Sequence, residues 1–282
     1  MSIQIIKRQC SFMLKRKGAG VAFYALFVIV LMNFITNVFE FQGLDRLEMY
    51  HPVKLLLLSY NRTYDNADFA LLLIQLYPIL VVCPSGSILL SEKQRREDTL
   101  IISRIGIKNY YLNIFISTFF VTAFIFTVPF LVELLLNCIS FPLSATGDFL
   151  GLSIYDPNYN EIRMRQSYLA PWLYSVNEYL YAVVGIIFFG FFSGVIGMTA
   201  VAISSFFKAK YKILSFIPTY VIVYTSFYLS EIVKLPISVC WYDYVLLFND
   251  SVKSGRFVCV LLVILTFASI GCALLKGNGD QL

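Results

Sequence analysis

Long apolar stretches recur along the chain, separated by shorter polar connections. Each stretch is about 20 residues long, which is the length that an α-helix needs to cross the hydrocarbon core of a bilayer. Because only helices and closed barrels satisfy their backbone groups inside lipid, the pattern predicts an all-α polytopic membrane protein. We expect six transmembrane helices, at residues 18–41, 69–90, 111–136, 179–206, 213–229 and 257–275.

A different apolar pattern precedes the first span. Ile6, Cys10 and Met13 recur at helical spacing, and Lys7 and Arg8 fall on the opposite face. This pattern predicts that residues 1–17 form a helix lying on the cytoplasmic surface of the membrane. A secretory signal peptide is the alternative, but the apolar run 21–39 is too long for one and no small-residue cleavage site follows it.

The remaining chain, residues 18–282, is predicted to form a single transmembrane domain. Its inner connection at 91–113 is rich in charge, and its outer connections are expected at 42–68, 137–174 and 230–256. Residues 137–174 form the longest outer connection, and long loops of this kind usually carry function or cover other structure. Aromatic residues in 230–256 suggest a segment that re-enters the outer leaflet.

The distribution of charge predicts the orientation. With the N-terminus inside, the inner side carries 14 of the 22 basic residues and only 4 of the 17 acidic residues. Cytoplasmic connections of membrane proteins carry an excess of Lys and Arg. We therefore expect both termini to be cytoplasmic.

Composition agrees with the membrane assignment. Hydrophobic residues make up 59% of the chain and charged residues 14%, whereas soluble domains carry roughly 25% charged residues. The six cysteines show no spacing typical of a metal site. Cys138 and Cys240 are both expected near the outer surface, where they either pair or, as we favour, remain free.

Several kinds of chemistry have no motif in this chain. It has no G-x-x-x-x-G-K-[ST] sequence for nucleotide phosphates, no H-E-x-x-H zinc motif, and a single histidine, His51, in an outer connection. We expect no catalytic residues, no metal, no cofactor bound by this chain and no nucleic-acid partner. The chain is therefore interpreted as a membrane protein that is not itself an enzyme.

Polar side chains inside the predicted spans are few. Asn33, Asn37, Gln75 and Glu133 are the candidates for an outward translocation path or a seam between two subunits, because polar groups in membrane helices usually face a cavity or a partner. Ordinary hydrogen bonds between helices of one chain are the alternative. The G-x-x-x-G sequence at Gly190 and Gly194 likewise suits close helix packing within a subunit or between two.

The inner connection reads SEKQRREDTLIISRIGIKNYYLN from Ser91. Residues 99–104 are predicted to form a short helix, with acids before its first turn and Arg104 at its end, which suits the helix dipole. A short helix held at the membrane surface between two spans is suited to being pushed by a soluble protein. An ordinary basic loop that obeys the positive-inside rule is the alternative.

This segment resembles the coupling segment of type-2 ABC exporter permeases, which often carry Glu-x-Gly-Thr-Leu after their second span. The matching residues are Glu92, Arg96, Glu97, Thr99, Leu100, Arg104 and Lys108, and Asp98 stands where the family usually has Gly. The resemblance implies a coupling helix that docks in a groove of a separate ATPase subunit, which binds ATP and Mg. The residues implied in coupling are Glu92, Arg96, Glu97, Thr99, Leu100, Ile101 and Arg104.

The resemblance implies a permease that moves a substrate outward in the plasma membrane, of bacterial type, paired with a second copy or a homologous permease. The bilayer is its other partner. Peptide, drug, lipid-linked glycan and lipid all remain open as cargo. Two alternatives also remain: an ATPase-linked immunity or sensor protein that binds a peptide through residues 137–174, and a carrier driven by ions.

Overall fold

The computed structural model describes residues 3–44, 49–59, 67–86, 88–94, 97–143, 169–206, 216–233, 238–248 and 254–279. The elements in these ranges are helices connected by turns and irregular segments. The helices are α1 (Ile3–Leu14), α2 (Lys17–Glu40), α3 (Ala67–Val82), α4 (Ile88–Gln94), α5 (Glu97–Ile105), α6 (Ile107–Ser140), α8 (Pro171–Val176), α9 (Glu178–Phe206), α10 (Ile217–Val233), α11 (Trp241–Val245) and α12 (Gly255–Gly279).

Four of the helices are long and apolar enough to cross a membrane: Lys17–Glu40, Ile107–Ser140, Glu178–Phe206 and Gly255–Leu275. The described residues thus confirm the prediction of an all-helical protein with several helices able to cross a membrane. The spans predicted at 69–90 and 213–229 correspond to α3 and α10, which have 16 and 17 residues. Six crossings therefore stay a prediction.

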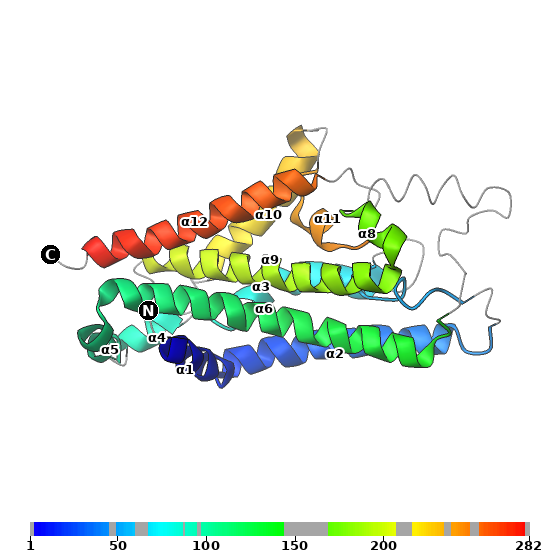
Figure 1. The fold of residues 1–282 in the computed structure, drawn as a ribbon, viewed down its shortest axis with the longest axis horizontal. Helices are drawn as coiled ribbons and strands as arrows, with labels where there is room; N and C mark the ends of the chain where they lie inside the picture. The colour runs from blue at the N-terminus through cyan, green and yellow to red at the C-terminus, as the bar shows by residue number, and fades with distance from the viewer. Residues whose placement is uncertain are drawn as a thin grey trace.

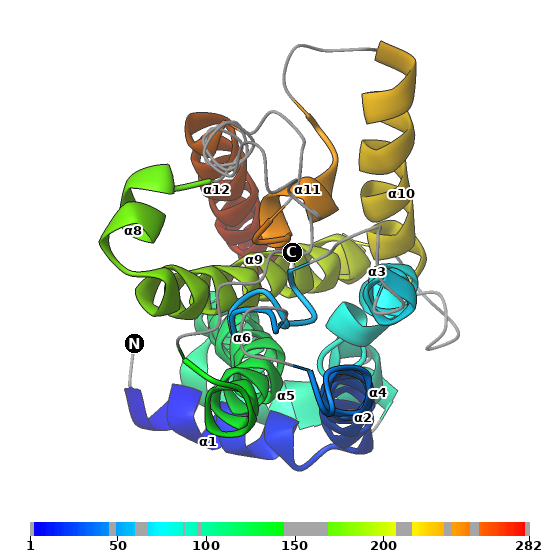
Figure 2. The same cartoon turned by 90° about the vertical axis from the view of Figure 1, so that its right-hand side faces the viewer.

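The long helices α2, α6, α9 and α12 run along the longest dimension of the bundle (Figure 1). α1, α5 and the C-terminal end of α12 lie at the same end of this bundle. α1 lies across the bundle, as seen where α2 and α6 are viewed end-on (Figure 2). This crosswise position matches the helix expected to lie along the membrane surface.

The apolar face of α1 packs on protein. Met13 is fully buried, and the Cys10 thiol lies 3.9 Å from the backbone carbonyl of Ser117 in α6. The predicted apolar face is therefore confirmed for these residues, but α6 covers it where the amphipathic pattern suggested lipid. Leu14, the residue after Met13, is 42% exposed.

Glycines bring α6 and α9 into close contact. A Cβ atom added at Gly190 would lie 2.8 Å from the carbonyl oxygen of Ala123, and one added at Gly194 would lie 2.8 Å from the carbonyl oxygen of Phe119. Both contacts are shorter than a real Cβ tolerates, so the two backbones approach as closely as glycine permits. The G-x-x-x-G sequence packs within this chain.

Pro84 and Pro218 lie at helix ends, whereas Pro78 lies inside α3 and Pro129 lies inside α6. The predicted span 69–90 is divided: α3 ends at Val82, Pro84 lies in the following turn, and α4 begins at Ile88. Because proline has no N–H to donate, it favours such a break. Pro218 lies in the first turn of α10, where proline costs no helical hydrogen bond, so it is placed at the start of a helix.

Candidate functional site

The short helix expected before the third span is α5. It covers Glu97–Ile105, somewhat longer than predicted, and it ends at Gly106, whose φ of 79° is a conformation that favours glycine. The Gly106 N–H closes the last turn by donating to the Ile102 carbonyl at 2.8 Å. α6 then begins at Ile107, so a displaced α5 acts directly on the end of a long helix.

The two faces of α5 differ. Ile101, Ile102 and Ile105 are partly buried and pack against the core. Leu100 is 67% exposed, and Thr99 and Arg104 are exposed as well. An apolar side chain that stands out beside a cation on a short helix is suited to entering a groove of another protein.

Glu92, in contrast to the exposed residues of α5, is buried inside the bundle. It is 2% exposed and lies in α4, where its Oε2 accepts a hydrogen bond of 2.5 Å from the Tyr110 hydroxyl of α6. Its Oε1 accepts a hydrogen bond of 3.3 Å from the Gln9 amide of α1. The Arg16 guanidinium donates to the neighbouring Ser91 hydroxyl. Glu92 therefore connects α4 to α1 and α6, a position in which it can orient the coupling segment but cannot touch a docked partner.

Two other residues of the predicted coupling set lie outside what the structure describes. Arg96 is not among the described residues, and for Glu97 the description covers the backbone of α5 without its side chain. The residues brought to the open surface are therefore Thr99, Leu100 and Arg104, with Ile101 half-buried beneath them.

Three of the four predicted path or seam residues meet in a second site, away from α5. Glu133 of α6 is fully buried, and its Oε1 accepts hydrogen bonds from the Asn33 amide at 2.7 Å and from the Leu57 N–H at 2.8 Å. The Asn33 and Asn37 amides of α2 donate to the Leu55 carbonyl at 3.1 and 2.9 Å. Gln75 does not join them and is exposed on α3.

These polar groups hold a buried segment that is not helical. Residues 49–59 connect toward α3 without regular helix, and the side chains of Leu55–Leu58 are at most 3% exposed. Irregular backbone at membrane depth must be satisfied by protein or by a water-filled cavity. Asn33, Asn37 and Glu133 supply hydrogen-bond partners from α2 and α6.

The sequence interpretation missed Asn137. Its amide donates to the Pro52 carbonyl at 3.4 Å, one helical turn beyond Glu133. Glu133 and Asn137 on α6 are four residues apart, as are Asn33 and Asn37 on α2. Residues with this spacing lie on one face of a helix, so the two polar pairs could have indicated that Asn137 belongs to the site.

The short helix α11 and the three residues after it pack on the segment 49–59. The Leu247 N–H donates to the Leu58 carbonyl at 2.9 Å, and the Leu247 carbonyl accepts from the Tyr181 hydroxyl at 2.8 Å. Residues 241–248, part of the connection expected to re-enter the outer leaflet, are buried here except for Tyr242, which is half-buried. The two segments and the polar pairs thus form one structural unit.

The cysteines are unpaired. Cys138 is half-buried and Cys240 is buried, and neither forms a disulfide. Burial, with a smaller contribution from the Asp243 carboxylate, raises the pKa of the Cys240 thiol to about 12, which keeps it protonated and unreactive.

Comparison with protein families, with curated proteins and with solved structures found no match for this chain. Its function is therefore inferred from the residues and contacts described above.

Proposed function

We propose that this chain is the membrane-spanning subunit of an ATP-driven exporter that resembles type-2 ABC permeases and works with a separate ATPase. The observation that supports this most is the division of α5: three isoleucines anchor it on the core, and Leu100 is left 67% exposed. One face of α5 is fixed to the core, and the other face presents an exposed apolar side chain. A partner that binds the exposed face can therefore push on the core through the fixed face.

In the first step of the proposed mechanism, the ATPase closes on ATP and thereby moves α5. Two routes lead from α5 into the bundle. One passes through Gly106 into α6, and the other passes through α4 and the Glu92 contacts with Gln9 and Tyr110. Displacement of α5 would then reach α1 and α6 together.

Six crossings complete the proposal. α3 and α10 are about 24 and 26 Å long at 1.5 Å per residue, slightly shorter than a hydrocarbon core of about 30 Å. A shorter helix is accommodated by local thinning of the bilayer, and α4 continues the chain beyond α3. With both included, the chain crosses an even number of times and both termini lie in the cytoplasm, as the charge distribution predicts.

The proposed path runs between two permease copies or between homologous permeases. Gln75, exposed on α3 beside Leu71, Leu72 and Ile79, is the candidate polar contact at this seam. Asn33, Asn37 and Glu133 are assigned instead to holding the buried segment 49–59 in place. They shape the outer end of the subunit without lining an open path.

The experiment is co-purification of the tagged chain from its native membranes, with bound proteins identified by mass spectrometry. We expect an ATP-binding subunit to accompany the wild type and to be lost in Leu100→Asp. Leu143→Asp is the matched control, because Leu143 is 59% exposed and lies beyond the opposite end of α6. An ATPase retained equally by both variants contradicts the proposal.

Substrate-stimulated ATP hydrolysis by the purified complex distinguishes export from the sensor or immunity alternative. Most of the loop on which that alternative depends, residues 144–168, lies outside the described residues. A transport activity that needs an ion gradient and no ATP-binding chain would instead identify an ion-driven carrier.

A further inference from the structure

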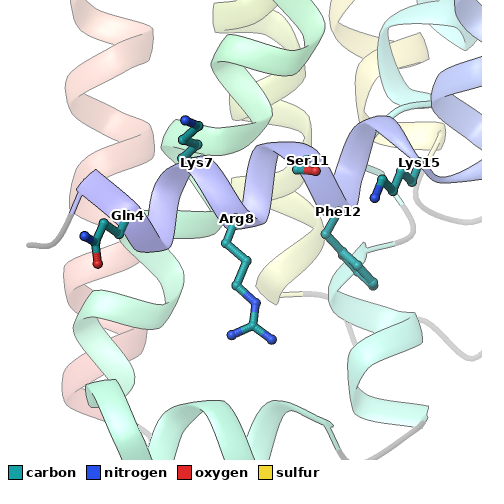
Figure 3. A pocket seen from close by; sticks show the side chains of 6 residues that line it. All are labelled: Gln4, Lys7, Arg8, Ser11, Phe12 and Lys15. Carbon is teal, nitrogen blue, oxygen red and sulfur yellow. The ribbon is translucent and has the colours of Figure 1, made fainter.

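The outer face of α1 carries a hollow of about 440 Å³ (Figure 3). Figure 3 shows Arg8 and Phe12 projecting to the same side of the helix. It is an open surface depression lined by α1 and the adjoining Lys15, which suits a headgroup that lies on the surface more than an enclosed ligand. The lining residues are Gln4, Lys7, Arg8, Ser11, Phe12 and Lys15.

Packing of α1 leaves this face open. Met13 and Cys10 turn toward α6, so residues on the opposite side of the helix face outward, and all six lining side chains are exposed. Helix α1 is thus held to the bundle by contacts that do not involve the hollow.

The charge of the hollow is uncompensated. Its lining contains three cations and no acid, and Lys7, Arg8 and Lys15 form no ion pair with any acid that the structure describes. Three unpaired cations within four helical turns create a positive potential that concentrates anions. The Ser11 hydroxyl and the Gln4 amide add neutral hydrogen-bond donors beside them.

We propose that this hollow binds the phosphate of an anionic phospholipid in the cytoplasmic leaflet. Two observations favour a lipid over a soluble phosphate. Phe12 and Leu14 are each 42% exposed beside the cations, which offers apolar contact to an acyl chain. α1 also directly precedes α2, a helix that can cross the membrane, and runs crosswise to it (Figure 2), which places α1 near the headgroups at the membrane surface.

The site does not depend on the exporter proposal, since it uses only α1 and the bilayer. Its consequence for the fold is that a bound headgroup would fix α1 in its crosswise position. Because Gln9 of α1 contacts Glu92 of α4, the lipid would also stabilise the support beneath the coupling segment.

The test uses the purified full chain in detergent, titrated with dioctanoyl phosphatidylglycerol or dioctanoyl phosphatidylcholine and followed by native mass spectrometry. We expect the wild type to prefer phosphatidylglycerol. Each basic residue near an anionic surface contributes roughly fivefold in affinity, so Lys7→Gln/Arg8→Gln should lower binding of phosphatidylglycerol about 25-fold. Lys17→Gln/Lys108→Gln removes the same charge at exposed positions outside the hollow and should keep the wild-type preference.

Four results would overturn the proposal. The first two are equal binding of both lipids by the wild type and an equal loss of phosphatidylglycerol binding in the two double variants. The third is displacement of the lipid by glycerol 3-phosphate at equal concentration. The fourth is that Lys7→Gln/Arg8→Gln keeps the wild-type lipid preference but no longer co-purifies with an ATPase subunit. The third would identify a site for soluble phosphate, and the fourth a contact with protein. Equal thermal stability of the variants, expected because Lys7 and Arg8 are exposed, excludes unfolding as the cause.

Discussion

Replacing Gly194 by alanine tests the packing on which the bundle depends. In the structure the added Cβ would lie 2.8 Å from the Phe119 carbonyl oxygen and 2.9 Å from the Phe119 ring. The ring can rotate, but the carbonyl belongs to α6 and moves only if the helix moves. We expect this variant to separate α6 from α9 by a few tenths of an ångström or more.

The magnitude follows from two opposing effects. Overpacking costs about 1–3 kcal/mol, and alanine in a helix is about 1 kcal/mol more favourable than glycine. Gly194→Ala should therefore destabilise the fold by up to about 2 kcal/mol. Gly271→Ala in α12 is the control, because its Cβ would meet nothing within 4 Å and only the propensity gain remains.

The assay is thermal unfolding of the purified chain in detergent, read by tryptophan fluorescence or by loss of the monodisperse peak. At about 2–4 °C per kcal/mol for a chain of similar size, the two alanine variants should differ in Tm by several degrees, with Gly194→Ala lower. Equal Tm values, or a more stable Gly194→Ala, would refute the close approach of α6 and α9.

Three further variants test the polar contacts and the end of α5. Glu133→Ala removes the acceptor of the Leu57 N–H and one of the two acceptors of the Asn33 amide, at about 1–3 kcal/mol for each lost bond. Glu133→Gln keeps an acceptor; if Tm and the protease resistance of residues 49–59 fall equally in both variants, the assigned hydrogen bonds are wrong. Glu92→Ala should lower the Tm of the chain more than Glu92→Gln, because it leaves the buried Tyr110 hydroxyl without its acceptor. An unchanged Tm would show that this contact is dispensable. Gly106→Ala places a side chain at φ 79° and ψ 153°, at a cost of about 1–3 kcal/mol, and should weaken ATPase association. Unchanged stability and association would mean that the α5–α6 junction adopts another backbone conformation.

The amino-acid pattern was sufficient for the features that depend on local sequence. Runs of apolar residues predicted the four long helices, because length and hydrophobicity alone decide whether a helix can cross a bilayer. Acids at 97–98 and Arg104 predicted α5 to within two residues at each end.

Other features depend on contacts between distant residues and could not be predicted. Glu92 was assigned to the coupling surface through the family resemblance, but it is buried, with contacts to the Tyr110 hydroxyl and to Gln9 of α1. The G-x-x-x-G sequence left its partner open, and only the position of α6 identified it. Asn33 and Glu133 are 100 residues apart and are hydrogen-bonded to each other beside the buried segment 49–59. The leucines of that segment suit a membrane surface as well as a buried turn, so the sequence did not indicate the contact.

A photoreactive side chain at position 100 tests the proposed coupling most directly. It would be introduced into the full chain in its native membrane, with position 102, which packs against the core, as the control site. We predict that irradiation joins position 100, and not position 102, to a cytoplasmic ATP-binding chain. Adducts formed only with proteins or reagents on the exterior, or adducts that contain no ATP-binding chain, would contradict the account.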